Sequence, residues 1–334
     1  MKYNDINFNN KTILITGGAG FIGSNLATYF EKNYPNSKIV IFDCFRSEET
    51  FSNGNLKSFG HFHNLLNYKG NLICGDINNS NDLSKLNDYK FDYIFHQAAI
   101  SDTRVYDQEI VMRTNVNSFY WFLNKAKNDD ACLVYASSAA TYGSLPSPQT
   151  IGYESPENPY GYSKLAMDHI AKEFSDENQS MQIVGLRFFN VYGTNEYFKN
   201  KTSSMVIQLA HQILDNKAPR LFKGSDKIFR DFVYIEDVIQ ANIKACSAKR
   251  NGAYNVGTGI ARSFQDIVDI IQLELGTNYT TEYFENPYSG YQMHTQAEIS
   301  LSRKYLHYDP KFSLEDGIHD YIGEIKKMHN FPKV

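Results

Sequence analysis

The chain has 334 residues, of which 42% are hydrophobic, enough to bury the core of one large domain or two modest ones. The formal net charge of -4 gives no basic surface of the kind that binds nucleic acid, and no apolar run approaches the roughly 20 residues of a membrane span. The 4 cysteines lack metal-ligand spacing and the polar first residues do not resemble a signal peptide, so we expect a cytoplasmic protein with reduced thiols and no metal.

The first predicted elements are a strand, a glycine turn and a helix. Residues 11–16 (KTILIT) are an apolar, β-branched run typical of a buried strand, and apolar side chains recur near helical spacing across residues 21–32. Between them, Gly17, Gly20 and Gly23 are spaced GxxGxxG. Glycine lets the backbone approach a pyrophosphate closely, and the following helix turns unpaired N–H groups and its positive dipole end towards that anion. This unit predicts a dinucleotide-binding site.

Further strand-like runs alternate with helical stretches, which is typical of an α/β fold with a doubly wound parallel sheet. These strands are expected at residues 38–43, 71–75, 91–96, 131–137 and 181–188. After position 190 the pattern loosens, with helices expected at 204–215, 235–248, 263–275 and 313–327. We therefore expect a Rossmann domain, residues 1–187 plus 230–262, and a smaller α+β substrate-binding lobe, residues 188–229 plus 263–334. The lobe should lie at the carboxyl edge of the sheet, where ligands of such sheets bind.

Residues at the ends of the predicted strands are candidates for cofactor binding. Asp43 lies about 20 positions after the last motif glycine, where an acidic residue bonds the adenosine ribose of NAD. Arg46 follows closely and could take the 2′-phosphate of NADP, or it could be an ordinary solvated loop residue. The sequence therefore leaves NAD and NADP open. The expected cofactor contacts are Gly17, Gly20, Phe21, Ile22, Gly23, Asp43, Cys44, Arg46, Asp76, Ile77, Gln97, Ala98, Ala99, Ser101, Asn115, Tyr160 and Lys164.

A second signal is the Tyr-x-x-x-Lys run at Tyr160 and Lys164, which follows Ser138 at the end of a predicted strand. On its own, such a pair usually marks a packed ring and a surface amine. A phenol with a pKa of about 10 is a poor base at neutral pH, but a neighbouring ammonium and an oxidised nicotinamide both favour the phenolate. We expect Tyr160 to be the acid and base, Lys164 its electrostatic activator, and Ser138 the partner of the substrate oxygen.

Together these motifs resemble the extended short-chain dehydrogenase/reductase superfamily, in its nucleotide-sugar epimerase branch, from Thr12 to about Tyr321. Longer strings, among them YASSAATYG, FFNVYG, LFKGSDKIFRDFVYIEDV and GYQMHTQAE, are similar to those of the ADP-L-glycero-D-manno-heptose 6-epimerase family. The resemblance implies an enzyme that holds one NAD or NADP tightly per subunit, oxidises C6 of the heptose to a ketone and reduces it on the opposite face. It also implies a homo-oligomer with a role in lipopolysaccharide biosynthesis.

The resemblance further implies a second catalytic base and a set of substrate contacts. The family's second base is a lysine that follows NVYG, which corresponds here to Lys199. Because residues 194–204 form a longer segment than the family pattern, Lys201 could take that role instead, and either lysine could simply be solvated. The expected substrate contacts are Ser138, Asn190, Ser204, His211, Phe222, Gly224, Ser225, Arg230 and Tyr291.

Three other functions fit parts of the sequence. A nucleotide-sugar 4,6-dehydratase needs an acid pair after the serine, and this chain has Ala139 and Ala140 there, which disfavours dehydration. A 4-epimerase or a dehydrogenase acting on another nucleotide sugar stays open, because small changes in a pocket redirect such enzymes. A redox-sensing binding module would keep the glycine loop but lose Tyr160 and Lys164, and both are present.

Overall fold

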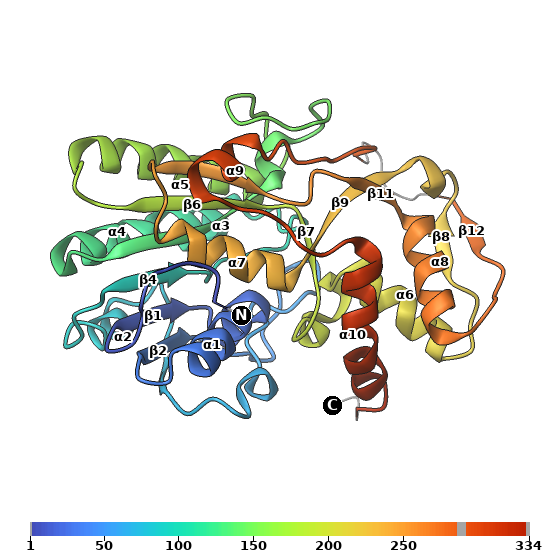
Figure 1. The fold of residues 1–334 in the computed structure, drawn as a ribbon, viewed down its shortest axis with the longest axis horizontal. Helices are drawn as coiled ribbons and strands as arrows, with labels where there is room; N and C mark the ends of the chain where they lie inside the picture. Colours follow the sequence, from blue (N-terminus) through green and yellow to red (C-terminus); the bar gives the residue numbers. More distant parts are fainter. Residues whose placement is uncertain (1, 286–291, 332–334) are drawn as a thin grey trace.

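A parallel sheet of seven strands forms the centre of the fold in the computed structural model, which describes residues 2–285 and 292–331 (Figure 1). The strand order is β10-β6-β5-β4-β1-β2-β3, and all neighbours pair in parallel. The predicted strands are confirmed, and β10 adds a further one beyond β6. The strands are β1 (Thr12–Thr16), β2 (Lys38–Asp43), β3 (Asn71–Cys74), β4 (Tyr93–His96), β5 (Cys132–Ser138), β6 (Ile183–Phe188) and β10 (Gly252–Val256).

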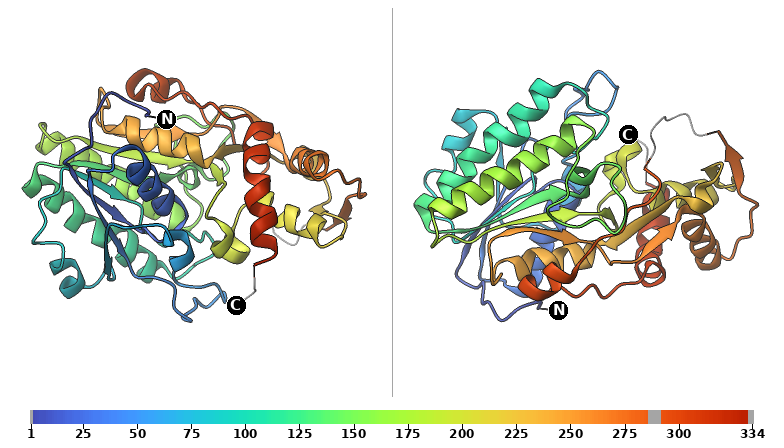
Figure 2. Two further views of the ribbon diagram at one scale, coloured as in Figure 1. Left: turned by 60° about the horizontal axis from the view of Figure 1, so that its bottom comes forward. Right: turned by 90° about the horizontal axis from the view of Figure 1, so that it is seen from above.

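Helices cover both faces of this sheet (Figure 2). Successive side chains of a strand point to opposite faces, so Ile13 and Ile15 of β1 pack in one core and Leu14 packs in the other. The first core includes residues of α1 (Phe21–Asn33) and α7 (Ile235–Ala245), and the second includes residues of α4 (Ser118–Asp129) and α5 (Pro159–Glu177). The doubly wound α/β architecture is therefore confirmed. The short helices α2 (Ser80–Ser84) and α3 (Gln108–Val111) complete this part, and α3 continues into α4 through a π-helical segment, η2 (Met112–Asn117).

A second group of elements lies beyond the carboxyl edge of the sheet (Figure 1). It contains a three-stranded sheet of β11 (Ala261–Ser263), β9 (Phe229–Tyr234) and β7 (Asn190–Tyr192), and a two-stranded sheet of β12 (Glu282–Phe284) and β8 (Arg220–Phe222). The helices α6 (Met205–Leu214), α8 (Phe264–Leu275) and α10 (Leu314–His329) pack on one another. The remaining helix, α9 (Ser300–Leu306), returns to β10.

Local sequence explains where two of these helices begin. Ser263 and Asp266 form a capping box at the start of α8, and Ser313 and Asp316 form one at the start of α10. In each box, the serine and the acidic side chain satisfy backbone N–H groups that the first turn leaves unpaired. The four helices predicted after position 190 are confirmed to within a few residues. Among the described residues, no helix is long and apolar enough to cross a membrane.

Candidate active site

The glycine turn between β1 and α1 is built so that only glycine fits. Gly17 has a φ of +66°, and a Cβ there would lie 2.8 Å from the Ala98 nitrogen. A Cβ on Gly23 would lie 2.3 Å from the Gly17 carbonyl oxygen, so the first turn of α1 rests directly on the loop. Gly20 is the N-cap residue of α1, and no side chain in the described part of the chain caps this end of the helix. The first N–H groups of the helix can therefore bind an anion such as a pyrophosphate.

Asp43, at the end of β2, holds this turn in place. Its Oδ2 accepts a hydrogen bond from the Ala19 N–H at 2.9 Å, and its Oδ1 accepts one from the Phe45 N–H at 2.7 Å. The side chain is only 5% exposed, and burial raises its pKa while the N–H groups act in the opposite direction. Asp43 therefore lies where the sequence predicts a ribose contact, and it also fixes the conformation of the glycine turn.

A cavity of about 400 Å³ runs from this turn to the start of α5. Its lining suits a dinucleotide, because a pyrophosphate would lie at the glycine turn and the start of α1 and a nicotinamide near Tyr160. The cavity also has a wall that the sequence did not reveal, residues 57–60, because this loop carries no periodic or motif signal. The predicted residues that line it are Gly17, Gly20, Phe21, Ile22, Gly23, Asp43, Cys44, Asp76, Ile77, Gln97, Ala98, Ala99, Ser101, Ser138, Tyr160, Lys164 and Lys199.

Two predicted cofactor contacts, Arg46 and Asn115, do not line this cavity. The backbone of Arg46 donates to the Gly60 carbonyl at 2.7 Å, in the loop that forms the cavity wall. Asn115 is fully buried in η2. Its Oδ1 accepts a hydrogen bond from the Ile100 N–H, and its Nδ2 donates to the Ile100 carbonyl and to Ser163 Oγ, the latter at 2.9 Å. Asn115 thus joins the loop after β4 to α5, which is a supporting position beneath the cavity.

Tyr160 and Lys164 lie in the first turns of α5, beside Ser138 at the end of β5. Asn158 fixes the start of α5, because its Oδ1 accepts a hydrogen bond from the Gly161 N–H at 2.8 Å. Lys164 is 1% exposed, and its Nζ donates to the Ala136 carbonyl at 2.8 Å. The same Nζ lies 5.9 Å from the centre of the Tyr160 ring. The structure therefore brings the three predicted catalytic groups together at one end of the cavity.

Burial changes the pKa values of the two titratable groups at this end of the cavity. Burial raises the pKa of Tyr160, and the hydrogen bond with Ser138 acts in the opposite direction. Burial lowers the pKa of Lys164 to about 8, although the nearby carboxylate of Asp168 acts to raise it. Burial of Tyr160 therefore opposes the phenolate that the sequence predicts, and the charges of Lys164 and of a bound nicotinamide would have to favour it.

Of the two lysines proposed as a second base, only Lys199 faces the cavity. Both belong to the 3₁₀ segment η4 (Tyr197–Thr202). Lys199 lines the cavity, with its Nζ 5.5 Å from the centre of the Phe21 ring, whereas Lys201 is exposed and lies outside it. Burial lowers the pKa of Lys199, while the carboxylates of Glu196 and Asp102 raise it.

Glu196 is a component of the site that sequence reasoning missed. It is fully buried, and it accepts hydrogen bonds from the Ser204 N–H at 2.6 Å, the Ser204 hydroxyl at 2.8 Å and the Gly193 N–H at 3.1 Å. Glu196 therefore links Gly193, which precedes η4, to Ser204, which follows it. These bonds fix the position of η4 and so of Lys199. No spacing in the sequence indicates this role.

The other predicted substrate contacts that the structure describes lie outside the cavity. Ser204 is bonded to Glu196, and His211 shares a 2.9 Å hydrogen bond between Nδ1 atoms with His329 of α10. Ser225 is buried, and Arg230 is 6% exposed and donates to the carbonyls of Phe229 and Gln292. The remaining positions are Asn190 at the start of β7, Phe222 against Phe284, Gly224 with a φ of +77°, and Tyr291, which lies outside the described residues.

The comparison with known families decides what kind of site this is. A match to the family described as NAD dependent epimerase/dehydratase covers residues 13–257. The chain belongs to this family. Membership confirms the predicted enzyme class and its nicotinamide cofactor. Within residues 2–285 and 292–331, no group of three or more His, Cys, Asp or Glu side chains is placed to hold a metal ion.

Solved structures of other members are similar over nearly the whole chain. The ADP-L-glycero-D-manno-heptose-6-epimerase of Helicobacter pylori is 47% identical, with a TM-score of 0.88 over 98% of this chain and 99% of that one. The UDP-glucuronic acid 4-epimerase of Bacillus cereus, in complex with UDP-glucuronic acid and NAD, is 28% identical, with a TM-score of 0.79 over 95% and 99%. The UDP-glucose 4-epimerase of Thermotoga maritima, 23% identical with a TM-score of 0.84 over 95% and 99%, shares the epimerase fold.

Proposed function

We propose that this chain is an ADP-L-glycero-D-manno-heptose 6-epimerase, which inverts C6 of the heptose by transient oxidation and re-reduction on the opposite face. The observation that carries the proposal is that two proton carriers from different elements, Tyr160 of α5 and Lys199 of η4, line one cavity together with the glycine turn. The 47% identity to the Helicobacter pylori enzyme over 98% of the chain supports the choice of sugar.

The site residues divide the chemistry between two poses of the sugar. A nicotinamide cofactor, held between the glycine turn and Tyr160, would supply reversible hydride transfer at C6. In one pose, Ser138 holds the C6 oxygen while Tyr160, as the phenolate that its hydrogen bond with Ser138 favours, accepts the hydroxyl proton. In the other pose, with the opposite face of the carbonyl presented, Lys199 returns a proton to the oxygen. Its lowered pKa suits this role, because an ammonium with a depressed pKa gives up its proton more readily.

The lobe beyond the carboxyl edge would hold the ADP portion of the substrate. Arg230 can pair with a diphosphate oxygen, and Asn190 and Ser225 offer neutral hydrogen bonds. This proposal includes the division into a Rossmann domain, residues 1–187 plus 230–262, and a substrate lobe, residues 188–229 plus 263–334. It also includes a homo-oligomer in the cytoplasm that works in lipopolysaccharide biosynthesis.

The experiment that tests this function is incubation of the purified protein with one C6 epimer of ADP-glycero-manno-heptose, followed by NMR of the sugar. UDP-glucose and UDP-glucuronate serve as parallel substrates. We expect the second C6 epimer to appear, with both UDP-sugars unchanged. Inversion at C4 of a UDP-sugar without reaction of the heptose would identify a 4-epimerase instead, and loss of water would identify a dehydratase.

A further inference from the structure

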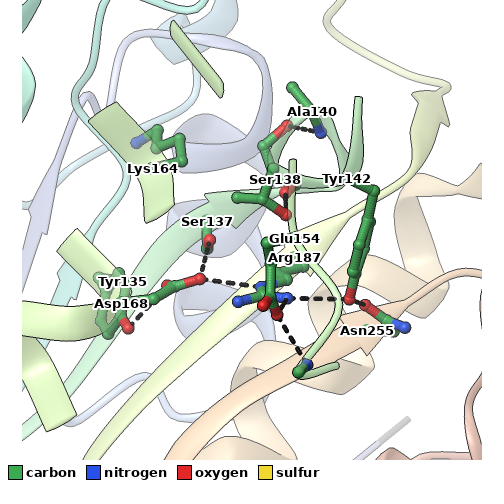
Figure 3. A network of polar contacts seen from close by, with 12 residues as sticks. Tyr135, Ser137, Ser138, Ala140, Tyr142, Glu154, Lys164, Asp168, Arg187 and Asn255 are labelled. Atoms are coloured by element: carbon green, nitrogen blue, oxygen red, sulfur yellow. Dashed lines mark hydrogen bonds and ion pairs between the residues drawn. The ribbon is translucent and has the colours of Figure 1, made fainter. Parts of the chain in front are cut away.

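A buried polar network lies directly behind the catalytic strand β5 (Figure 3). At its centre is Asp168, one helical turn after Lys164 on α5. Its Oδ1 accepts a hydrogen bond from the Tyr135 hydroxyl at 2.9 Å. Its Oδ2 accepts one from the Ser137 hydroxyl at 3.0 Å and one from Arg187 Nε at 2.8 Å. All four residues of this cluster are buried, with Asp168 7% exposed and Arg187 3% exposed.

The network continues from Arg187 to residues that lie farther along the chain from β5 and on β10. Arg187 Nη1 donates to Glu154 Oε1 at 2.6 Å and to the Tyr142 oxygen at 3.0 Å. The Tyr142 hydroxyl in turn donates to Asn255 Oδ1 of β10 at 2.6 Å. Figure 3 shows Arg187 between Asp168 on one side and Tyr142 on the other. The guanidinium thus joins α5 to the segment after η3 (Ala139–Tyr142) and to β10.

The bonds to Asp168 fix the register of α5 on β5. Tyr135 and Ser137 are two positions apart on the strand, so their side chains project from the same face, towards α5. Between them, Ala136 offers its carbonyl to Lys164 Nζ. The helix is therefore bonded to the strand on both sides of Ala136, immediately before Ser138. A shift of α5 by a fraction of a turn would break these bonds and would separate Tyr160 and Lys164 from Ser138.

Stability alone does not explain charged groups at this place. Removing a carboxylate and a guanidinium from water costs several kcal/mol for each ion, and a hydrophobic contact of the same size is often as stable. The face of α5 towards the sheet already carries Met167 and Ala171, which are buried in the apolar core. Charge-assisted hydrogen bonds add direction, which apolar packing lacks.

We propose that Asp168 is a positioning residue, which sets α5 in register on β5 and thereby holds Tyr160 and Lys164 against Ser138. This inference rests on the proposed function only in taking those three residues as the catalytic group. Asp168 also acts on the charge of Lys164, because its carboxylate favours the ammonium that burial disfavours. Tyr160 on α5 and His96 on β4 face Lys164. Tyr135 on β5 and Arg187 on β6 face Asp168, and Arg187 also contacts Glu154.

The test compares Asp168→Asn with Glu154→Gln. Each variant removes one carboxylate from Arg187, but only Asp168 contacts the strand beside Lys164. The Lys164 amine is titrated by NMR in protein carrying 13C-labelled lysine, with Lys164→Arg to assign the signal. We expect its pKa to fall by about one unit or more in Asp168→Asn, the usual effect of removing a nearby opposite charge, and to stay unchanged in Glu154→Gln. An unchanged pKa in Asp168→Asn, or an equal fall in both variants, overturns the proposal.

A second variant covers the case in which Asp168→Asn does not fold. Tyr135→Phe deletes one hydrogen bond to Asp168 and leaves every charge of the network paired. We expect kcat for epimerisation to fall about tenfold with KM unchanged, and the same kcat as the unmodified protein contradicts the positioning role. The NMR titration needs no sugar. A Lys164 pKa that shifts in Asp168→Asn, in a protein that does not epimerise the heptose, would therefore reject the proposed function and keep the link between Asp168 and Lys164.

Discussion

Replacing Gly23 with Ala tests the glycine turn through the space that the structure leaves for a methyl group. The added Cβ would lie 2.3 Å from the Gly17 oxygen and 2.7 Å from the Gly18 Cα, about 1 Å closer than ordinary van der Waals contact. These are backbone atoms, so relief requires α1 to move away from the turn. Overpacking of this kind costs about 3 kcal/mol, and the better helix propensity of alanine returns about 1 kcal/mol. We expect a net loss of about 2 kcal/mol in the free energy of unfolding.

Gly323→Ala is the matched control, since Gly323 also lies within a helix, α10. A Cβ at Gly323 would meet nothing within 4 Å. The same substitution should therefore raise the free energy of unfolding there by about 1 kcal/mol.

Denaturant unfolding of both variants gives the two stabilities, and the nicotinamide that co-purifies with each reports the cofactor site. We expect Gly23→Ala to lose most of its cofactor, because any shift of α1 withdraws the N–H groups that face the pyrophosphate. The Gly323→Ala protein should co-purify with as much nicotinamide cofactor as the original protein. A Gly23→Ala protein as stable as the original, with its cofactor in place, would refute the close packing described for this turn.

Three further predictions concern single side chains. Tyr160→Phe should keep cofactor binding and lower turnover by about 100-fold or more, the worth of a positioned acid and base, and full activity would place the chemistry elsewhere. Lys199→Met should slow epimerisation steeply and Lys201→Met should not; the reverse result would assign the base to Lys201, and two active variants would contradict the two-base mechanism. Burial lowers the pKa of His96 from 6.5 to about 3, so the unfolded chain takes up a proton in that window that the folded chain does not. The free energy of unfolding should therefore fall with decreasing pH, by up to about 1.4 kcal/mol per unit for this group, and His96→Asn should give a shallower slope in a pH series of urea unfolding. An unchanged slope in His96→Asn would show that His96 titrates normally.

The parts that the sequence predicts are those that depend on local pattern or on the geometry of parallel sheets. Apolar runs located β1 and β2 to within a residue, since a buried strand needs continuous apolar side chains. Ser138, Tyr160 and Lys164 could be predicted to meet because carboxyl ends of parallel strands share one edge. The strand β10 (GAYNV) begins with glycine and alanine and has an asparagine before its last residue, so it gave no continuous apolar, β-branched run.

The parts that escaped prediction depend on contacts between distant segments. Glu196 and the Arg187–Asp168 pair are polar residues at buried positions, and their partners lie on other elements. Asn115 was predicted to touch the cofactor, yet its amide braces Ile100 and Ser163 below the cavity. No periodicity distinguishes a buried polar residue with partners from an exposed one, so these roles appear only in the folded structure.

The most direct test of the central claim follows the hydrogen at C6 of the substrate. ADP-heptose carrying deuterium at C6 is incubated with the purified protein, without added NAD or NADP, and the product is examined by NMR and mass spectrometry. Oxidation and re-reduction within one closed site predict an inverted product that retains the deuterium, with no accumulation of reduced nicotinamide in the near-ultraviolet spectrum. Replacement of the deuterium by solvent hydrogen, or stoichiometric formation of reduced nicotinamide, would contradict this account.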